Sequence, residues 1–354
     1  AKPFRKTGHL MNIHSWAPVY VNVERIMDMS YDKLYQLAAP GATLISQNLL
    51  GTATTTLGYS HHDGRHQGHL NFNYTGLFPV IELSLDVNDR EKSFYEFTDE
   101  GKLSDPIGAG KPSVDASLLI YAPLNLARSG YSSALIPKIT FNYSNDEYDY
   151  GRLGKVSNQS FSYGVRFYKM LPKTRSSLMP RCGWGAEASG VYVPGPRGMG
   201  SQVACGYVYG YLPGLSKQQG VKLTVTSQKQ FTGALGTYLS SIASLPRGYS
   251  REVLDNYCKL TADYAIPISL NDWHPVPILY LMRINCVPFV DVAWNMVGTE
   301  RQQRMCSYGS SVSFVGHYVR IGAQVEVGVR AGRWYDTRKG EWSNSFRLVT
   351  GVSL

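Results

Sequence analysis

The sequence predicts an all-β protein: a transmembrane antiparallel β-barrel of about 16 strands with a long extracellular loop folded into its lumen. Three observations predict it. Apolar and polar residues alternate along most of the chain, and a period of two belongs to β-strands. Many of these runs extend over about ten residues or more, the length that a tilted membrane-spanning strand needs. Charged residues lie in the middle of the polar faces, where a wet lumen accepts them and a packed core does not.

The clearest alternation is in "VRIGAQVEVGVR", residues 319–330. We expect this segment to span the membrane, with Ile321, Val325 and Val327 facing lipid and Glu326 and Arg330 facing the lumen. The same pattern is found in "LNFNY", "IELSLDVN", "ITFNY", "FSYGVRFY", "VKLTVT" and "FRLVTGVSL". Aromatic residues near the strand ends, as in membrane girdles, are Tyr143, Tyr163, Trp294 and Phe346.

About fifteen or sixteen strands are expected between residue 42 and the C-terminus. They fall near 42–49, 52–62, 67–77, 79–89, 114–127, 131–145, 158–171, 181–193, 201–213, 219–230, 256–269, 276–295, 305–315, 317–331 and 343–354, with a further short strand near 92–98. Residues 1–41 show no strand pattern, and "YDKLYQLAAPG" (31–41) predicts a short helix that ends at Pro40 and Gly41. We therefore expect two parts: residues 1–41, an N-terminal periplasmic or plug-like segment, and residues 42–354, the barrel.

The composition agrees with this class. Only 17% of the 354 residues are charged, below the usual quarter, and 35 Gly with 18 Pro argue against long helices. The net charge of +9 indicates a basic surface or an anionic partner, but no Lys/Arg run or basic helix points to nucleic acid. The five cysteines form no CxxC pair and have no histidine at zinc-ligand spacing. We therefore expect most of them to be small apolar side chains that fill space in the fold.

Soluble architectures remain the alternative. A sandwich or a propeller uses the same alternation, burying one face and wetting the other. The strand lengths, the aromatic ends and the charges in mid-strand favour the membrane barrel, with lipid outside and water inside.

One segment interrupts the strand pattern: "QFTGALGTYLSSIASLPRGYSREVLD", residues 230–255. Long loops of this kind tend to be functional or disordered. It contains Arg247, Gly248 and Tyr249, and the next two strands carry Asp263 and Asp291 in their polar phase. Two carboxylates facing each other across adjacent strands repel, and the guanidinium of an infolded loop removes that repulsion. We expect Arg247 to contact Asp291, with Asp263 as its second partner.

These residues resemble the BamA-type superfamily of outer-membrane assembly and secretion barrels. In that family a (V/L)RG(F/Y) motif on the sixth extracellular loop folds back into the lumen, and its Arg pairs with acidic residues on the next two strands, one of them in an FxDxG motif. The matching residues here are Leu245-Pro246-Arg247-Gly248-Tyr249, Asp263 and Phe289-Val290-Asp291. Asp263 replaces the usual Glu, and Ala293 replaces the motif's Gly. Five strands are expected after the loop, as in the family's sixteen-strand topology.

The N-terminal part of the chain departs from the family. Residues 1–41 are too short for a periplasmic POTRA domain. "HSWAPVY" with "PGATLISQNLLGTATTTLGY" resembles the start of barrels that follow a periplasmic propeller in Bacteroidetes-type bacteria. Two interpretations stay open: such an N-terminal domain is not in this chain, or this member works without it. Leu354 also stands where these barrels commonly end in an aromatic residue.

The resemblance implies a protein of the Gram-negative outer membrane that assists insertion, assembly or translocation of proteins through a weakly closed seam between its first and last strands. Gly51, Gly58 and Gly351 permit such a seam. The implied partners are the lipid bilayer, lipopolysaccharide, and envelope or client outer-membrane proteins; neither a cofactor nor nucleic acid is expected. The alternative is a passive channel or a structural subunit of a larger outer-membrane complex.

Catalytic and metal sites are weakly indicated. "HHDGRHQGH" (61–69) contains four histidines, but Asp63-Gly64 predicts a hairpin turn rather than a metal site. "PGPRGMG" (194–200) predicts a hairpin loop, since no helix follows it for phosphate binding. No Ser/His/Asp constellation stands out, so we expect no enzyme, although an outer-membrane hydrolase with residues scattered over the barrel stays open.

Overall fold

The computed structural model describes residues 10–21, 38–62, 64–96, 104–151, 154–174, 177–195, 200–233, 238–250, 252–298, 301–318, 324–336 and 340–353. Its strands are β1 (Ile13–Val21), β2 (Ala38–Gln47), β3 (Ala53–His62), β4 (Arg65–Tyr74), β5 (Val80–Glu96), β6 (Ile107–Tyr121), β7 (Leu124–Asn125), β8 (Ser132–Asp149), β9 (Lys155–Met170), β10 (Gly183–Val193), β11 (Ser201–Pro213), β12 (Gly220–Phe231), β13 (Asn256–Val276), β14 (Leu279–Val297), β15 (Arg301–Tyr318), β16 (Gln324–Asp336) and β17 (Glu341–Ser353). No helix in these ranges is both long and apolar enough to cross a membrane.

All of these strands belong to one antiparallel sheet of up-and-down connectivity. Each strand from β1 to β6 pairs with the next, β6 pairs with β8, and the series continues to β17. The two-residue β7 pairs with the start of β8. A short parallel contact joins the end of β5 to the end of β8, where β5 continues past a bulge in its pairing with β6. The predicted all-β class is confirmed.

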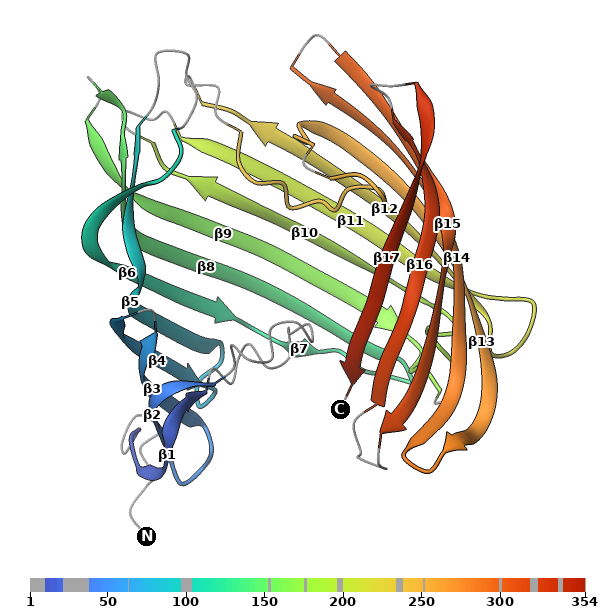
Figure 1. Cartoon of the computed structure of the whole chain (residues 1–354), viewed down its shortest axis with the longest axis horizontal. Helices are drawn as coiled ribbons and strands as arrows, with labels where there is room; N and C mark the ends of the chain where they lie inside the picture. Colours follow the sequence, from blue (N-terminus) through green and yellow to red (C-terminus); the bar gives the residue numbers. More distant parts are fainter. Residues whose placement is uncertain are drawn as a thin grey trace.

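The sheet curves around an open interior (Figure 1). Within the described residues no register joins β17 to β1 or β2, and Figure 1 shows these two ends of the sheet apart. The long connection between β12 and β13 runs along the concave side. The arrangement is a barrel-type wall rather than a two-layer sandwich, because the described strands form a single sheet.

The two faces of the wall differ in chemistry as the alternation predicts. On the convex face of the C-terminal half, apolar side chains are exposed in successive strands: Leu223, Val225, Leu260, Val290, Val312, Phe314, Val327, Val329 and Leu348. On the concave face, Glu326 accepts hydrogen bonds from Asn285 (3.2 Å) and from the hydroxyl of Ser313. Soluble proteins rarely expose a continuous apolar surface of this kind.

Most predicted strands are found with small changes in their ends. The range 201–213 coincides with β11, and the short strand near 92–98 is the continuation of β5. The strand predicted at 317–331 is wrong in its position: β15 runs to Tyr318 and β16 begins at Gln324. Val327, predicted to face lipid, is exposed on the convex face, while residues 319–323, including Ile321, lie outside the described residues.

The prediction that residues 1–41 contain no strand is also wrong. β1 lies wholly within this segment and pairs with β2, which itself begins at Ala38. The end of the predicted helix 31–41 therefore belongs to β2, and residues 31–37 lie outside the described residues. The sheet begins before residue 42. A periplasmic position of the N-terminal segment stays a prediction.

Candidate functional site

The loop between β12 and β13 is held against the concave face of the sheet by two glutamines of β12. The side-chain oxygen of Gln228 accepts hydrogen bonds from the backbone N–H groups of Ile242 and Ala243, both at 2.8 Å. Its amide nitrogen donates to the carbonyl of Leu254 at 2.8 Å. Gln230 binds Leu239 through both of its amide atoms. Because buried polar groups need partners, the two glutamines and this stretch of loop stabilise each other.

β13 holds the next residue of the loop. Lys259 donates to the carbonyl and to the hydroxyl of Ser244, at 2.8 and 2.6 Å, and Tyr257 donates to the same carbonyl at 3.1 Å. Residues of the loop and of the wall also form a small apolar core, against which Leu245 and Tyr249 pack. Its members are Cys205, Ala243, Leu254, Tyr257, Ala293 and Met305. The loop is therefore part of the folded interior, with its own core.

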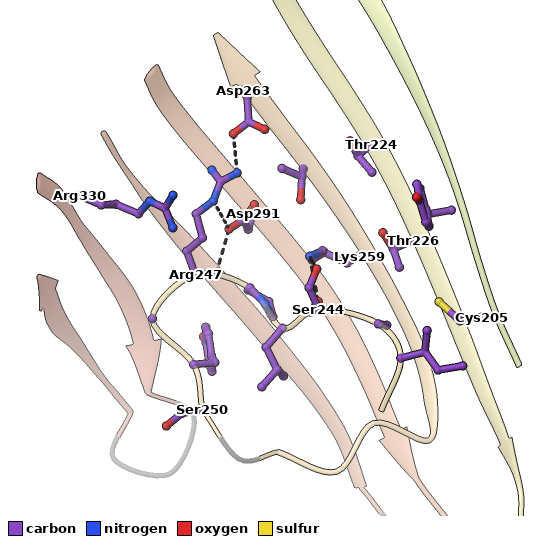
Figure 2. A pocket seen from close by; sticks show the side chains of 18 of the residues that line it. Cys205, Thr224, Thr226, Ser244, Arg247, Ser250, Lys259, Asp263, Asp291 and Arg330 are labelled. Carbon is purple, nitrogen blue, oxygen red and sulfur yellow. Dashed lines mark hydrogen bonds and ion pairs between the residues drawn. The ribbon is translucent and has the colours of Figure 1, made fainter. Parts of the chain in front are cut away.

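Arg247 extends from this loop towards two carboxylates (Figure 2). Its Nη2 lies 2.6 Å from Asp263 Oδ1, an ion pair whose atoms are not aligned as a hydrogen bond. Its Nε lies 3.8 Å from Asp291 Oδ2, and its backbone N–H donates to that same oxygen at 3.0 Å. The guanidinium also lies over the ring of Phe289, 4.2 Å from its centroid, in a cation–π contact.

The register of β13 and β14 corrects the expected geometry in two respects. Asp263 is opposite Phe289, and Asp291 is opposite Thr261, so the two acids are diagonal neighbours rather than directly opposite. Their mutual repulsion is accordingly weaker than that of a directly opposed pair. In addition, the Arg247 side chain is closer to Asp263, whereas Asp291 mainly holds the loop backbone.

Gly248 and Tyr249 connect the loop to β15 and β16. Gly248 has a φ of +98°, and a Cβ there would lie 2.7 Å from Cδ1 of Trp334. Only glycine combines that backbone conformation with this close approach. The Tyr249 ring packs edge-on against Trp334 with centroids 4.8 Å apart; its hydroxyl donates to the Tyr335 carbonyl and accepts from the Cys306 N–H at 3.0 Å.

A cavity of about 1000 Å³ lies between this loop and the sheet. Its charged lining residues are Glu187, Lys222, Arg247, Lys259, Asp263, Asp291, Arg330 and Arg347. Arg330 and Arg347 occupy directly opposite positions of β16 and β17. Such a lining suits water and polar or ionic partners. Pockets that bind apolar small molecules are instead lined mostly by hydrophobic side chains.

All six residues of the predicted loop–lumen site, Arg247, Gly248, Tyr249, Asp263, Phe289 and Asp291, thus lie in one region. Sequence reasoning missed Gln228, Gln230, Lys259 and Trp334, which hold or contact the loop. The polar phase of "TVTSQKQF" placed both glutamines on the inner face next to the loop, and that was the available signal. Nothing in the sequence around Trp334 indicates its contact with Gly248, because that contact joins distant parts of the chain.

The weaker predicted sites are hairpins. His61 pairs with His66 and His62 with Arg65 across the β3–β4 turn, of which Asp63 lies outside the described residues. Val193 pairs with Ser201 across the "PGPRGMG" loop, where residues 196–199 are likewise not described. Among the described residues no group of three or more His, Cys, Asp or Glu side chains is arranged to hold a metal ion. The five cysteines are not disulfide-bonded.

These features define a barrel-type antiparallel sheet with a loop folded against its inner face. No protein-family model matches the chain, and no curated protein matches it in sequence. A solved structure that is similar in fold is BamA from Haemophilus ducreyi lacking POTRA domains 1–3. The two share 13% identity over 88% of this chain and 67% of that chain, with a TM-score of 0.48.

Proposed function

We propose that this chain is a BamA-like barrel of the Gram-negative outer membrane, and that it assists insertion, assembly or translocation of proteins there. The observation that carries the proposal is the folded-in loop, whose Arg247 lies between Asp263 and Asp291. The five strands that follow the loop in the described chain, β13 to β17, fit the family topology. The proposed role is not enzymatic.

The outer surface and the sheet edges support a membrane role. The convex face presents apolar side chains that a lipid core would cover. Among the described strands β17 pairs only with β16, so its other edge can accept a further strand. The N-terminal strand of the proposed seam is β1 rather than the segment near residue 42, because β1 precedes β2 in the sheet. The proposed partners are lipid, lipopolysaccharide and client outer-membrane proteins.

A photocrosslinking amino acid at Thr350 tests the role of the β17 edge in the full chain in outer membranes. We expect adducts with unfolded outer-membrane proteins at Thr350. The matched control is Val165, which is also exposed but lies in β9, between β8 and β10. Photocrosslinking also avoids the background of the native thiols.

The alternative function is a passive channel or a structural subunit of a larger complex. The charged cavity of about 1000 Å³ beside Arg247 is the observation in its favour. Steady ion conductance in a planar bilayer, together with equal or absent crosslinking at Thr350 and Val165, would replace the assembly role by this one.

A further inference from the structure

A second polar cluster lies on the concave face at the other end of the sheet, on the neighbouring strands β3, β4 and β5. Ser60 Oγ is 3.1 Å from His69 Nε2, and His69 Nδ1 is 2.7 Å from Asp86 Oδ1. His69 is directly opposite Asp86 in the β4–β5 register, and Ser60 is one diagonal step away on β3. The atoms thus follow the order hydroxyl, imidazole, carboxylate, which is the order of a nucleophile, its base and the group that orients the base.

The partners of His69 fix which of its nitrogens carries the proton. When the ring carries one proton, on Nδ1, the carboxylate of Asp86 accepts its hydrogen bond and the Nε2 lone pair faces Ser60. The charge of Asp86 stays available to His69, because Arg90 forms its ion pairs with Asp115, at 2.9 Å, and Asp146, at 2.7 Å. Asp115 is the residue opposite Asp86 on β6.

The Ser60 hydroxyl has a second acceptor that holds it at rest. It donates to Gln67 Oε1 at 2.7 Å, and the amide nitrogen of Gln67 donates to the carbonyl of Asp89 at 3.2 Å. The Asp89 contact fixes the orientation of the amide, so its oxygen faces Ser60. The hydroxyl has a single hydrogen, so activation requires this donation to pass from Gln67 to His69.

Tyr20 of β1 covers the cluster. Its ring stacks on the His69 ring with centroids 4.2 Å apart and planes 12° apart, and Ser60 is only 1% exposed. A Cβ at Gly58 would lie 2.3 Å from the Tyr20 ring, so Gly58 makes the space in which the ring lies. In the described chain β1 pairs only with β2, and its displacement leaves the other strand pairs intact.

We propose that Ser60 is a nucleophile activated by His69 and Asp86 for acyl transfer from small carboxylic esters, and that Tyr20 covers it until β1 moves. Ser60 Oγ bonds to the ester carbonyl carbon while its proton passes to His69 Nε2. The bond to the alcohol oxygen then breaks, and the alcohol leaves with that proton. Water then bonds to the acyl carbon and gives one proton to His69. The bond between the acyl carbon and Ser60 Oγ breaks, Oγ takes that proton from His69, and the carboxylic acid leaves.

An alkyl fluorophosphonate, which forms an adduct with activated serines, tests the proposal on the full chain in detergent micelles. Mass spectrometry should find an adduct at Ser60 that forms at least about tenfold faster in Tyr20→Ala, and at least about tenfold slower in His69→Gln and in Asp86→Asn. Ser60→Ala should remove the adduct. Ser84→Ala, at another inward serine of β5, should label like the unaltered chain.

Hydrolysis of p-nitrophenyl acetate gives a second readout, expected in Tyr20→Ala and lost when Ser60→Ala is added. Each variant is first checked for the folded band in unheated gels. If Tyr20→Ala lacks that band, Tyr20→Leu carries the same expectation, since it removes the ring but keeps an apolar side chain. An unlabelled Ser60 in a folded Tyr20 variant, or unchanged labelling in His69→Gln, would show that the cluster is only a hydrogen-bonded part of the wall. The outcome does not depend on the proposed assembly role.

Discussion

The ion pairs of Arg247 are intermediate in burial between exposed and fully buried pairs. Its side chain is 25% exposed, whereas that of Asp291 is 2% exposed. An exposed pair contributes about 1 kcal/mol or less, and breaking a buried one costs about 3–5 kcal/mol. The loss of Arg247 should therefore cost about 2–3 kcal/mol, most of it from leaving the carboxylates of Asp263 and Asp291 without the guanidinium.

Arg247→Ala should lower the temperature at which the folded band disappears in gels and should increase protease cleavage near Tyr249. Arg247→Lys should recover little of this, because an ammonium cannot lie flat on Phe289 and reach both acids with a planar fork. Full recovery by lysine would mean that only the charge matters at this position.

A double-mutant cycle with Asp263 isolates the side-chain pair, because Asp291 also binds the loop backbone and receives a hydrogen bond from Ser307. Asp263→Asn combined with Arg247→Ala should be no less stable than Arg247→Ala alone, within about 0.5 kcal/mol. Denaturant unfolding of the four proteins measures this. Fully additive losses would contradict a direct interaction between the two side chains.

At the scale of elements, the loop depends on the backbone of Gly248 as well as on charge. Gly248→Ala introduces both a left-handed strain of about 1–2 kcal/mol and a clash with Trp334. Gly298→Ala is the matched control, because Gly298 also has a positive φ, +61°, with nothing within 4 Å of its Cβ position. Gel melting should show a clearly larger loss for Gly248→Ala. Equal losses in the two variants would leave the Trp334 contact without an energetic role.

The sequence predicts most strands because their alternation is separated by turn residues, as in β11 and β12. It fails between β15 and β16, where alternation continues through "HYVRIGAQVEV" and nothing in the period marks the turn. It also misses β1 and the first residues of β2, because Pro18 and Pro40 indicate chain breaks, yet proline is tolerated near a sheet edge. The residues of the loop–lumen site were predictable from a motif and from the phase of the strands. The polar cluster of Ser60, His69 and Asp86 was not predictable, because these residues are brought together only by the register of β3, β4 and β5.

At the scale of the whole molecule, the apolar convex face and the charged concave face require different surroundings. A soluble sandwich would cover one face with a second sheet, and the described strands provide none. We therefore propose that lipid covers the convex face and water fills the concave side, where the Arg247 loop is packed.

Spin labels on neighbouring residues of β15 and on β16 test this proposal most directly, after the exposed or partly exposed cysteines Cys182, Cys258, Cys286 and Cys306 are changed to serine. Val312 of β15 faces outward, and Ser311 faces the opposite way; Val327 repeats the outward position on β16. In lipid vesicles we expect labels at Val312 and Val327 to respond to a lipid-soluble relaxation agent and the label at Ser311 to an aqueous one. Equal aqueous access at Ser311, Val312 and Val327 would contradict the membrane barrel.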